Sequence, residues 1–230
     1  MPPTIMFVGA HHDDNELMAG TITRHRAAGW HVVSVVMTNG TWTQGGVADA
    51  NIERRNEESL AAAALLDMEP VFLGFPEGIF AATAETTRAV VEVIRRCRPE
   101  VIVTHPPRDY HADHMATSRT VEDAVYRAGC PACDAPGPRH GGMRFYYCDA
   151  WATPFEPDTY VDVSEHSAVK REALACHKSQ LVGGVPTTGD MIDIELTRSR
   201  NRGFESECEY AEAYRFVPRL GSVRKMPLLG

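Results

Sequence analysis

Short apolar runs alternate with longer polar or alanine-rich segments through the first hundred residues. We expect strands from the apolar runs at residues 5–10, 31–38, 71–73 and 101–104. The segments between them predict helices over residues 17–28, 51–66 and 85–96. Continuous apolar runs are typical of strands buried on both faces, and their alternation with helices predicts a parallel sheet. The expected fold class is therefore α/β, a Rossmann-like three-layer fold with a mostly parallel sheet covered by helices on both faces.

The second half of the chain continues this pattern less regularly. It predicts strands at 145–148 and 160–163, a helix at 164–177, another helix after Gly189 and an extended segment at 210–217. Residues 129–142 are rich in Pro and Gly and predict a surface loop. We find no internal repeat, and 230 residues is a usual length for one domain, so we expect a single domain over residues 1–230.

Composition and charge narrow the function classes. Acidic residues outnumber basic ones by 31 to 23, a formal net charge of −8, and there is no Lys/Arg run, so no nucleic-acid partner is expected. No apolar stretch is long enough for a membrane span. The Met-Pro-Pro start leads directly into an apolar strand rather than a secretory signal, and the six cysteines lack a disulfide-framework spacing. We therefore expect a cytoplasmic protein with reduced thiols.

Two polar clusters follow the first and fourth predicted strands. Residues 10–16 read A-H-H-D-D-N-E, and residues 104–114 read T-H-P-P-R-D-Y-H-A-D-H. In open α/β sheets, ligands bind outside the carboxyl ends of the strands, so both clusters lie where such a fold places its site. A catalytic zinc site uses three His or carboxylate ligands and leaves one position open for water. Either cluster alone could be a helix cap, but two at one sheet edge favour a metal site.

The spacing within the clusters allows shared coordination of one ion. His11 and Asp14 reach the same ion if the backbone between them curls. His111 and His114 share a face if a helix begins there. Asp13 and Asp14 are neighbours whose side chains point apart, so one can bind metal while the other faces the attacking water as a base.

These clusters resemble the motifs of a known family. Residues 10–15 are similar to the A-H-P-D-D-E motif of the LmbE-like (PIG-L) zinc-dependent N-deacetylases, and residues 111–114 to their H-x-D-H motif. Further similar segments follow in the same order, at residues 54–58, 71–78, 170–180 and 210–212. The resemblance implies an enzyme that removes the N-acetyl group from an N-acetylglucosamine-type sugar or conjugate by attack of a zinc-bound water. Bacterial relatives often form trimers or hexamers, so the resemblance is compatible with a homo-oligomer of this kind.

The resemblance also implies roles for individual residues. The implied metal ligands are His11, Asp14 and His114. The implied catalytic residues are Asp13 as general base, His111 as stabiliser of the oxyanion, and Asp113 as the group that orients the His111 ring. The expected substrate-binding residues are Arg55, Glu77 and Tyr110. The implied cofactor is Zn2+, although such a ligand set also accepts Fe2+, Co2+ or Mn2+.

Two positions depart from the family motif. His12 stands where the family has proline, and Asn15 where it has glutamate. As the neighbour of His11, the His12 side chain should point away from the metal and serve in packing or hydrogen bonding, with substrate contact as the alternative. Trp42 is either a loop anchor or a surface on which a sugar stacks. The rest of the substrate is expected to contact loops at residues 41–50 and 129–142.

Other functions stay open at this point. The substrate is alternatively another N-acyl compound, such as a thiol-sugar conjugate or an antibiotic precursor. A protein that binds metal without catalysis is a third alternative, against which Asp13 argues because a mere binder does not need this second carboxylate. A nucleotide-binding module would need a G-x-G-x-x-G turn after the first strand, and the acidic turn at residues 11–14 would repel a pyrophosphate.

Overall fold

The computed structural model describes residues 2–43, 45–150, 153–181 and 190–218. Within these residues the main sheet has seven strands in the order β5-β2-β1-β6-β7-β9-β8. Their bounds are β1 Thr4–Gly9, β2 His31–Thr38, β5 Glu69–Phe75, β6 Val101–Thr104, β7 Arg144–Cys148, β8 Thr159–Asp162 and β9 Ala211–Phe216. The first five strands in that order are parallel, and β9 runs antiparallel to β7 and β8. The predicted α/β fold with a mostly parallel sheet is confirmed.

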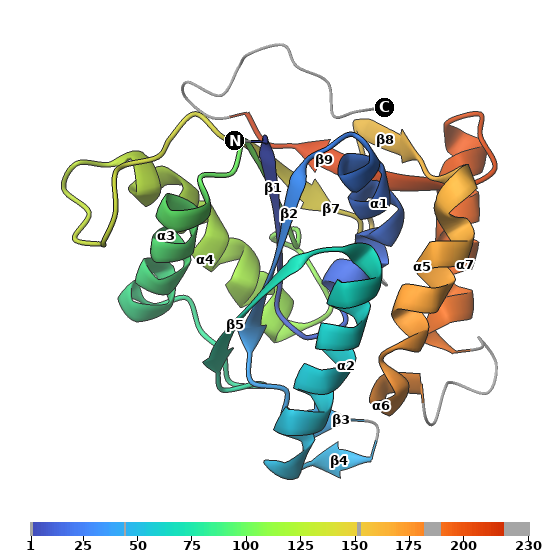
Figure 1. Ribbon diagram of the computed structural model, residues 1–230, viewed down its shortest axis with the longest axis horizontal. Helices are drawn as coiled ribbons and strands as arrows, with labels where there is room; N and C mark the ends of the chain where they lie inside the picture. Colours follow the sequence, from blue (N-terminus) through green and yellow to red (C-terminus); the bar gives the residue numbers. More distant parts are fainter. Residues whose placement is uncertain (1, 44, 151–152, 182–189, 219–230) are drawn as a thin grey trace.

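Helices cover both faces of the sheet (Figure 1). The helices on one face are α1 (Ala19–Ala27), α2 (Ala50–Leu66) and α5 (Ser167–Ala175); those on the other are α3 (Ala84–Cys97) and α4 (Ala112–Gly129). Successive side chains of β1 serve the two layers in turn, since Ile5 and Phe7 pack with the first set and Met6 and Val8 with the second. Every residue of β1 is buried, which explains its continuous apolar run.

Several elements differ in detail from the sequence prediction. The first predicted helix starts with a 3-10 turn, η1 (Asn15–Met18), before α1. The helix predicted at 164–177 is divided into η2 (Ser164–His166) and α5, and the short helix α6 (Lys178–Leu181) follows. The helix expected after Gly189 is α7 (Met191–Glu205), while Gly189 itself lies outside the described residues. No helix among the described residues is long and apolar enough to cross a membrane.

A short hairpin that the sequence pattern did not indicate lies near the carboxyl edge of the sheet. It consists of β3 (Trp42–Thr43) and β4 (Gly46–Val47), which pair antiparallel in the loop between β2 and α2. Strands of two residues carry too few alternating positions to be recognised as a pattern.

The topology fixes where a ligand can bind. The chain passes from β1 to β2 and β5 on one side and then returns to β6 on the other side of β1. The strand order therefore reverses between β1 and β6, and such a reversal opens a crevice at the carboxyl ends of the strands. Both polar clusters found in the sequence begin at these two strand ends.

Candidate metal and active site

The turn after β1 curls back so that Asp14 faces His11. The His11 backbone N–H donates to Asp14 Oδ2 at 2.6 Å. Gly9 permits this fold, because a Cβ atom there would lie only 2.7 Å from the Asp14 Cβ. From the other strand, α4 begins at Ala112 and presents His114 in its first turn. The curl and the helix that the sequence analysis required are therefore both present.

The three expected metal ligands meet at one point. His11 Nδ1 lies 3.2 Å from His114 Nε2 and 3.4 Å from Asp14 Oδ2, and His114 Nε2 lies 3.4 Å from Asp14 Oδ1. Ligands bound at 2.0–2.1 Å around a tetrahedral zinc ion are separated by about 3.3–3.4 Å. The donor atoms of His11, Asp14 and His114 therefore have the chemistry and spacing that fit such an ion.

Two further histidines border the same point. Among the described residues, donor atoms of His11, His111 and His114 form one group that could hold a metal, and those of Asp14, His105 and His114 form another. His105 Nε2 lies 3.0 Å from Asp14 Oδ2, and the His105 ring stacks on His114 with centroids 4.0 Å apart. Sequence reasoning gave His105 no role, because its place at the end of β6 has an ordinary structural explanation.

Carboxylates contact the far nitrogens of both expected histidine ligands. Asp113 Oδ2 lies 3.2 Å from His11 Nε2, and Asp109 Oδ1 lies 3.1 Å from His114 Nδ1. Such partners fix the orientation of a metal-binding imidazole and increase its basicity. Asp109 was missed by the sequence analysis; its position five residues before His114 carries no motif, and the loop conformation alone brings it there.

Asp113 was expected to orient the His111 ring, and its carboxylate lies against His11 instead. Asp113 Oδ2 also accepts a hydrogen bond from the Gly78 N–H at 2.7 Å, on the side of His11. Asp113 meets His111 instead through its backbone N–H, which donates to His111 Nδ1 at 3.2 Å. His111 caps α4 in this way, and the neutral ring then carries its proton on Nε2.

The charges of the cluster are strongly coupled. Burial alone would lower the pKa of His11, but the Asp14 charge and hydrogen bonds to Asp113 and Asp14 outweigh it and raise this pKa to about 9. Burial would also lower the pKa of His114, but the charges of Asp14 and Asp109 and the hydrogen bonds to them outweigh burial and raise this pKa to about 10. The pKa of Asp14 is held well below its ordinary value, because the surrounding histidines outweigh its burial. Asp14 therefore favours the protonated form of each imidazole.

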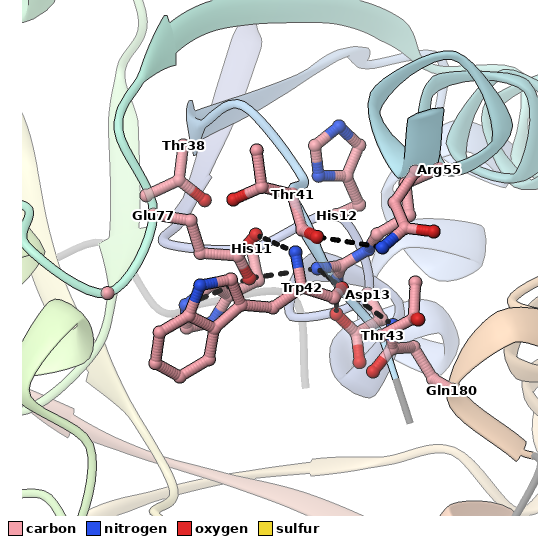
Figure 2. Close-up of polar contacts among 12 residues, drawn as sticks. His11, His12, Asp13, Thr38, Thr41, Trp42, Thr43, Arg55, Glu77 and Gln180 are labelled. Carbon is pink, nitrogen blue, oxygen red and sulfur yellow. Dashed lines mark hydrogen bonds and ion pairs between the residues drawn. The ribbon is translucent and has the colours of Figure 1, made fainter. Parts of the chain in front are cut away.

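Asp13 points to a different partner, the guanidinium of Arg55 (Figure 2). Arg55 Nη2 lies 2.8 Å from Asp13 Oδ1, and Nη1 lies 2.9 Å from both Glu77 Oε1 and the Trp42 carbonyl oxygen. The Arg55 side chain is only 2% exposed. Each of these contacts joins Arg55 to another group of the protein and none involves a substrate. The expected role of Arg55 and Glu77 in substrate binding therefore stays a prediction.

A cavity of about 370 Å³ opens beside these groups. It is lined by side chains from both clusters and from the hairpin, including His11, Asp13, Asp14, Trp42, Tyr110 and His114. Tyr110 is 54% exposed and meets His111 and His114 edge-on. Burial and the charges of His11 and His114 lower the pKa of His111, which leaves a neutral ring beside the cavity.

The structure explains the two departures from the family motif. His12 is buried away from the cluster, donates from Nε2 to Asn56 Oδ1 at 2.8 Å and stacks on Phe72. The expected packing and hydrogen-bonding role of His12 is confirmed. Asn15 Nδ2 donates to Ser34 Oγ and to the Val35 carbonyl, which ties the turn to β2.

Only one of the two loops expected to contact the substrate lies at the cavity. The hairpin within residues 41–50 contributes Trp42 and Thr43 to its lining. The loop at 129–142 instead packs at the amino end of β6, where His140 bonds to Ala128 and Pro99. A connection that follows the carboxyl end of α4 returns to the opposite edge of the sheet, so this part of the prediction was wrong.

The comparison with known proteins agrees with the geometry of the site. Residues 6–125, just over half of the chain, match the PIG-L family, described as GlcNAc-PI de-N-acetylase. This chain belongs to the PIG-L family. A diacetylchitobiose deacetylase of Thermococcus kodakarensis is 28% identical over 93% of this chain and 83% of its own length.

Two further proteins are similar to this chain. A 4-oxalmesaconate hydratase of Pseudomonas putida is 26% identical over 76% of this chain and 73% of its own length. The crystal structure of a conserved protein from Thermus thermophilus is 27% identical and superposes with a TM-score of 0.83, over 96% of this chain and 99% of that one. The two proteins therefore share their fold over nearly the whole of this chain.

Proposed function

We propose that this PIG-L family member is a metal-dependent hydrolase that removes the N-acetyl group from an N-acetylglucosamine-type sugar or conjugate. The observation that carries the proposal is the meeting of His11, Asp14 and His114 within 3.2–3.4 Å of one another, in a cavity that also holds the Asp13 carboxylate. Membership of a family described by de-N-acetylation supports the same reaction.

The three clustered residues would hold a divalent ion, for which we propose Zn2+. When bound, such an ion polarises the amide carbonyl and lowers the pKa of water from 15.7 to about 7. Asp113 and Asp109 hold the ligand imidazoles by their far nitrogens, so the ligands keep their orientation while the reaction proceeds.

Asp13 and His111 are placed for the proton and charge changes of amide hydrolysis. Asp13 takes a proton from the attacking water, whose oxygen bonds to the acetyl carbon. The neutral His111 donates from Nε2 to the carbonyl oxygen as negative charge develops there. The C–N bond then breaks, Asp13 passes its proton to the leaving nitrogen, and acetate and the free amine are released. Arg55 holds Asp13 in place throughout.

A direct test couples metal analysis to an amine-release assay on N-acetylglucosamine and its glycosides, before and after chelator treatment. We expect close to one metal ion per chain and chelator-sensitive release. Asp13→Ala should keep the metal and lose nearly all turnover, whereas His11→Ala and His114→Ala should lose both. Asp123→Ala, on the exposed side of α4, serves as the control and should behave as wild type.

Other outcomes separate the remaining functions. Metal without amine release from any acetylated sugar would overturn the proposal. Turnover of another N-acyl compound would then indicate a different amidase, and turnover of an unsaturated acid would indicate a hydratase, as one relative is named. Normal rates in Asp13→Ala would disprove the assigned base.

A further inference from the structure

Trp42 is an exposed aromatic side chain at the edge of the cavity. It lies in the two-stranded hairpin, is 42% exposed and lines the same cavity as His11, Asp13 and Asp14. In Figure 2 its indole extends from the hairpin beside Glu77 and His11, on the side opposite Gln180. Exposure by itself is common among the large apolar side chains of this protein, so what distinguishes Trp42 is its place at the cavity.

The backbone of Trp42 is fixed far more firmly than its exposure would suggest. Its N–H donates to Glu77 Oε2 at 2.9 Å. Its carbonyl oxygen accepts from Arg55 Nη1 at 2.9 Å and from Gln180 Nε2 at 3.4 Å. Arg55 and Glu77 are themselves buried and joined by an ion pair, so the exposed indole is attached to a rigid polar support.

The indole also has a defined resting place. Gly78 has φ +79°, and a Cβ atom there would lie 2.2 Å from Trp42 Cζ2. The six-membered part of the indole therefore occupies the space that any other residue at position 78 would fill. One edge of the ring is packed, while the rest of the side chain stays open at the cavity.

We propose that Trp42 is a specificity-determining residue whose indole stacks on the apolar C–H face of the substrate's pyranose ring. The inference rests on the proposed function and names the part of the substrate that this site recognises. An indole is large, flat and amphipathic, and gives contact energy with few rotamers to lose. Open-chain N-acetyl compounds offer no such face.

The same support links the stacking surface to the proposed base. One guanidinium bonds both the Trp42 carbonyl and the Asp13 carboxylate. A sugar ring seated on Trp42 is therefore held at a fixed distance from Asp13, which aligns its acetamido group with the reacting atoms. Binding and alignment consequently depend on the same aromatic ring.

The first arm of the test is kinetic and uses methyl N-acetylglucosaminide as the substrate. Trp42→Leu keeps apolar bulk beside Gly78 but removes the ring, and should raise KM about tenfold, with unchanged metal content and thermal unfolding. Trp42→Phe should recover part of this loss. With N-acetylethanolamine, an open-chain amide, wild type and Trp42→Leu should have equal kcat/KM.

The second arm measures binding without turnover, from the tryptophan fluorescence of the metal-free protein titrated with N-acetylglucosamine. The chain has three tryptophans. Trp42→Phe should abolish the sugar-induced change in emission, and the matched variant Trp30→Phe should retain it, since Trp30 packs against the core next to His25.

The two arms decide between stacking and a purely structural anchor. A KM unchanged in Trp42→Leu, or a sugar-induced signal that survives in Trp42→Phe, would overturn the inference while amine release stays intact. If wild type releases no amine from any sugar, the proposed function fails instead. The fluorescence titration then still reports whether Trp42 binds a pyranose.

Discussion

Replacing Arg55 by methionine tests the polar support beneath the candidate site. Met has a similar length and no charge, so Arg55→Met removes the guanidinium without leaving a large void. Two carboxylates, those of Asp13 and Glu77, lose their partner in the same step. We expect both the stability and the activity of the protein to fall.

The expected loss of stability follows from the burial of the two partners. Unit charges about 4 Å apart attract by about 4 kcal/mol at an effective dielectric constant of ~20, and removing one partner of a buried pair costs about 3–5 kcal/mol. The Glu77 side chain is 3% exposed, so no water replaces the guanidinium there, whereas Asp13 at 17% regains some hydration. One full uncompensated charge gives a loss of about 3–5 kcal/mol, or roughly 6–20 °C in Tm for a domain of this size.

Thermal and urea unfolding of chelator-treated protein measure this loss without a contribution from metal binding. The double variant Arg55→Met/Glu77→Gln removes the stranded charge and should recover most of the stability. It should not recover amine release, which we expect to fall about 100-fold in both variants because Asp13 is no longer held in place. Glu92→Gln, in an exposed pair with Arg88, is the matched control and should change neither property.

Either of two results would refute this reasoning. Unfolding of Arg55→Met within about 1 kcal/mol of wild type would mean that the buried pairs contribute no more than surface ones. Recovery of activity in the double variant would mean that Arg55 does not act through Asp13.

Three other predictions follow from the structure. Asp113→Asn should lower metal affinity by about 10- to 100-fold, measured by competition with a chelating dye, because the far nitrogen of His11 loses its carboxylate; equal affinity would contradict that role. Metal affinity should rise with pH up to about 9–10, because the pKa values of His11 and His114 are raised to about 9 and about 10 and the ion must displace their protons; calorimetry in buffers of different ionisation enthalpy counts the protons released. Lys170→Met should destabilise by about 3–5 kcal/mol in urea unfolding, because Lys170 Nζ lies 3.1 Å from Glu212 Oε1 and 3.5 Å from Glu195 Oε2 in a buried cluster, and Lys170→Met/Glu212→Gln should recover only part of the loss because Glu195 stays charged.

The sequence predicted the fold well because its strongest signals are local. A surface strand would place polar side chains at alternate positions. The almost uninterrupted apolar runs of β1, β2 and β6 leave few such positions and so indicate buried strands. The predicted ends of helices and strands were less accurate where tertiary contacts determine them. The turn at Asp14 is one case: η1 precedes α1 because the carboxylate is drawn back to the His11 N–H.

The site was predictable where the clustered residue types, His and Asp at strand ends, have few roles other than metal binding. His11, Asp14 and His114 meet as expected because both clusters start at adjacent strand ends. The partners behind them were not fully predictable. Asp109 is placed by the loop conformation, and Asp113, which was expected to orient His111, directs its carboxylate to His11 from the first turn of α4. Contacts that depend on side-chain direction in a turn cannot be read from a one-dimensional pattern.

The charges of the same cluster also bear on how the protein folds without a bound ion. Asp13 and Glu77 pair with the Arg55 guanidinium, whereas the carboxylates of Asp14, Asp109 and Asp113 contact only histidines and backbone N–H groups among their observed partners. Without charge on those histidines, the site would hold a buried excess of negative charge, which opposes folding. Below pH about 6.5, protonated His11 and His114 contribute two positive charges, and this stabilisation is lost as the pH rises through about 9 and about 10. A divalent ion brings the same two charges to the same atoms. If these residues bind a divalent ion as proposed, the ion would replace the two protons and leave the charge of the site unchanged, so it would enter a site that is already formed.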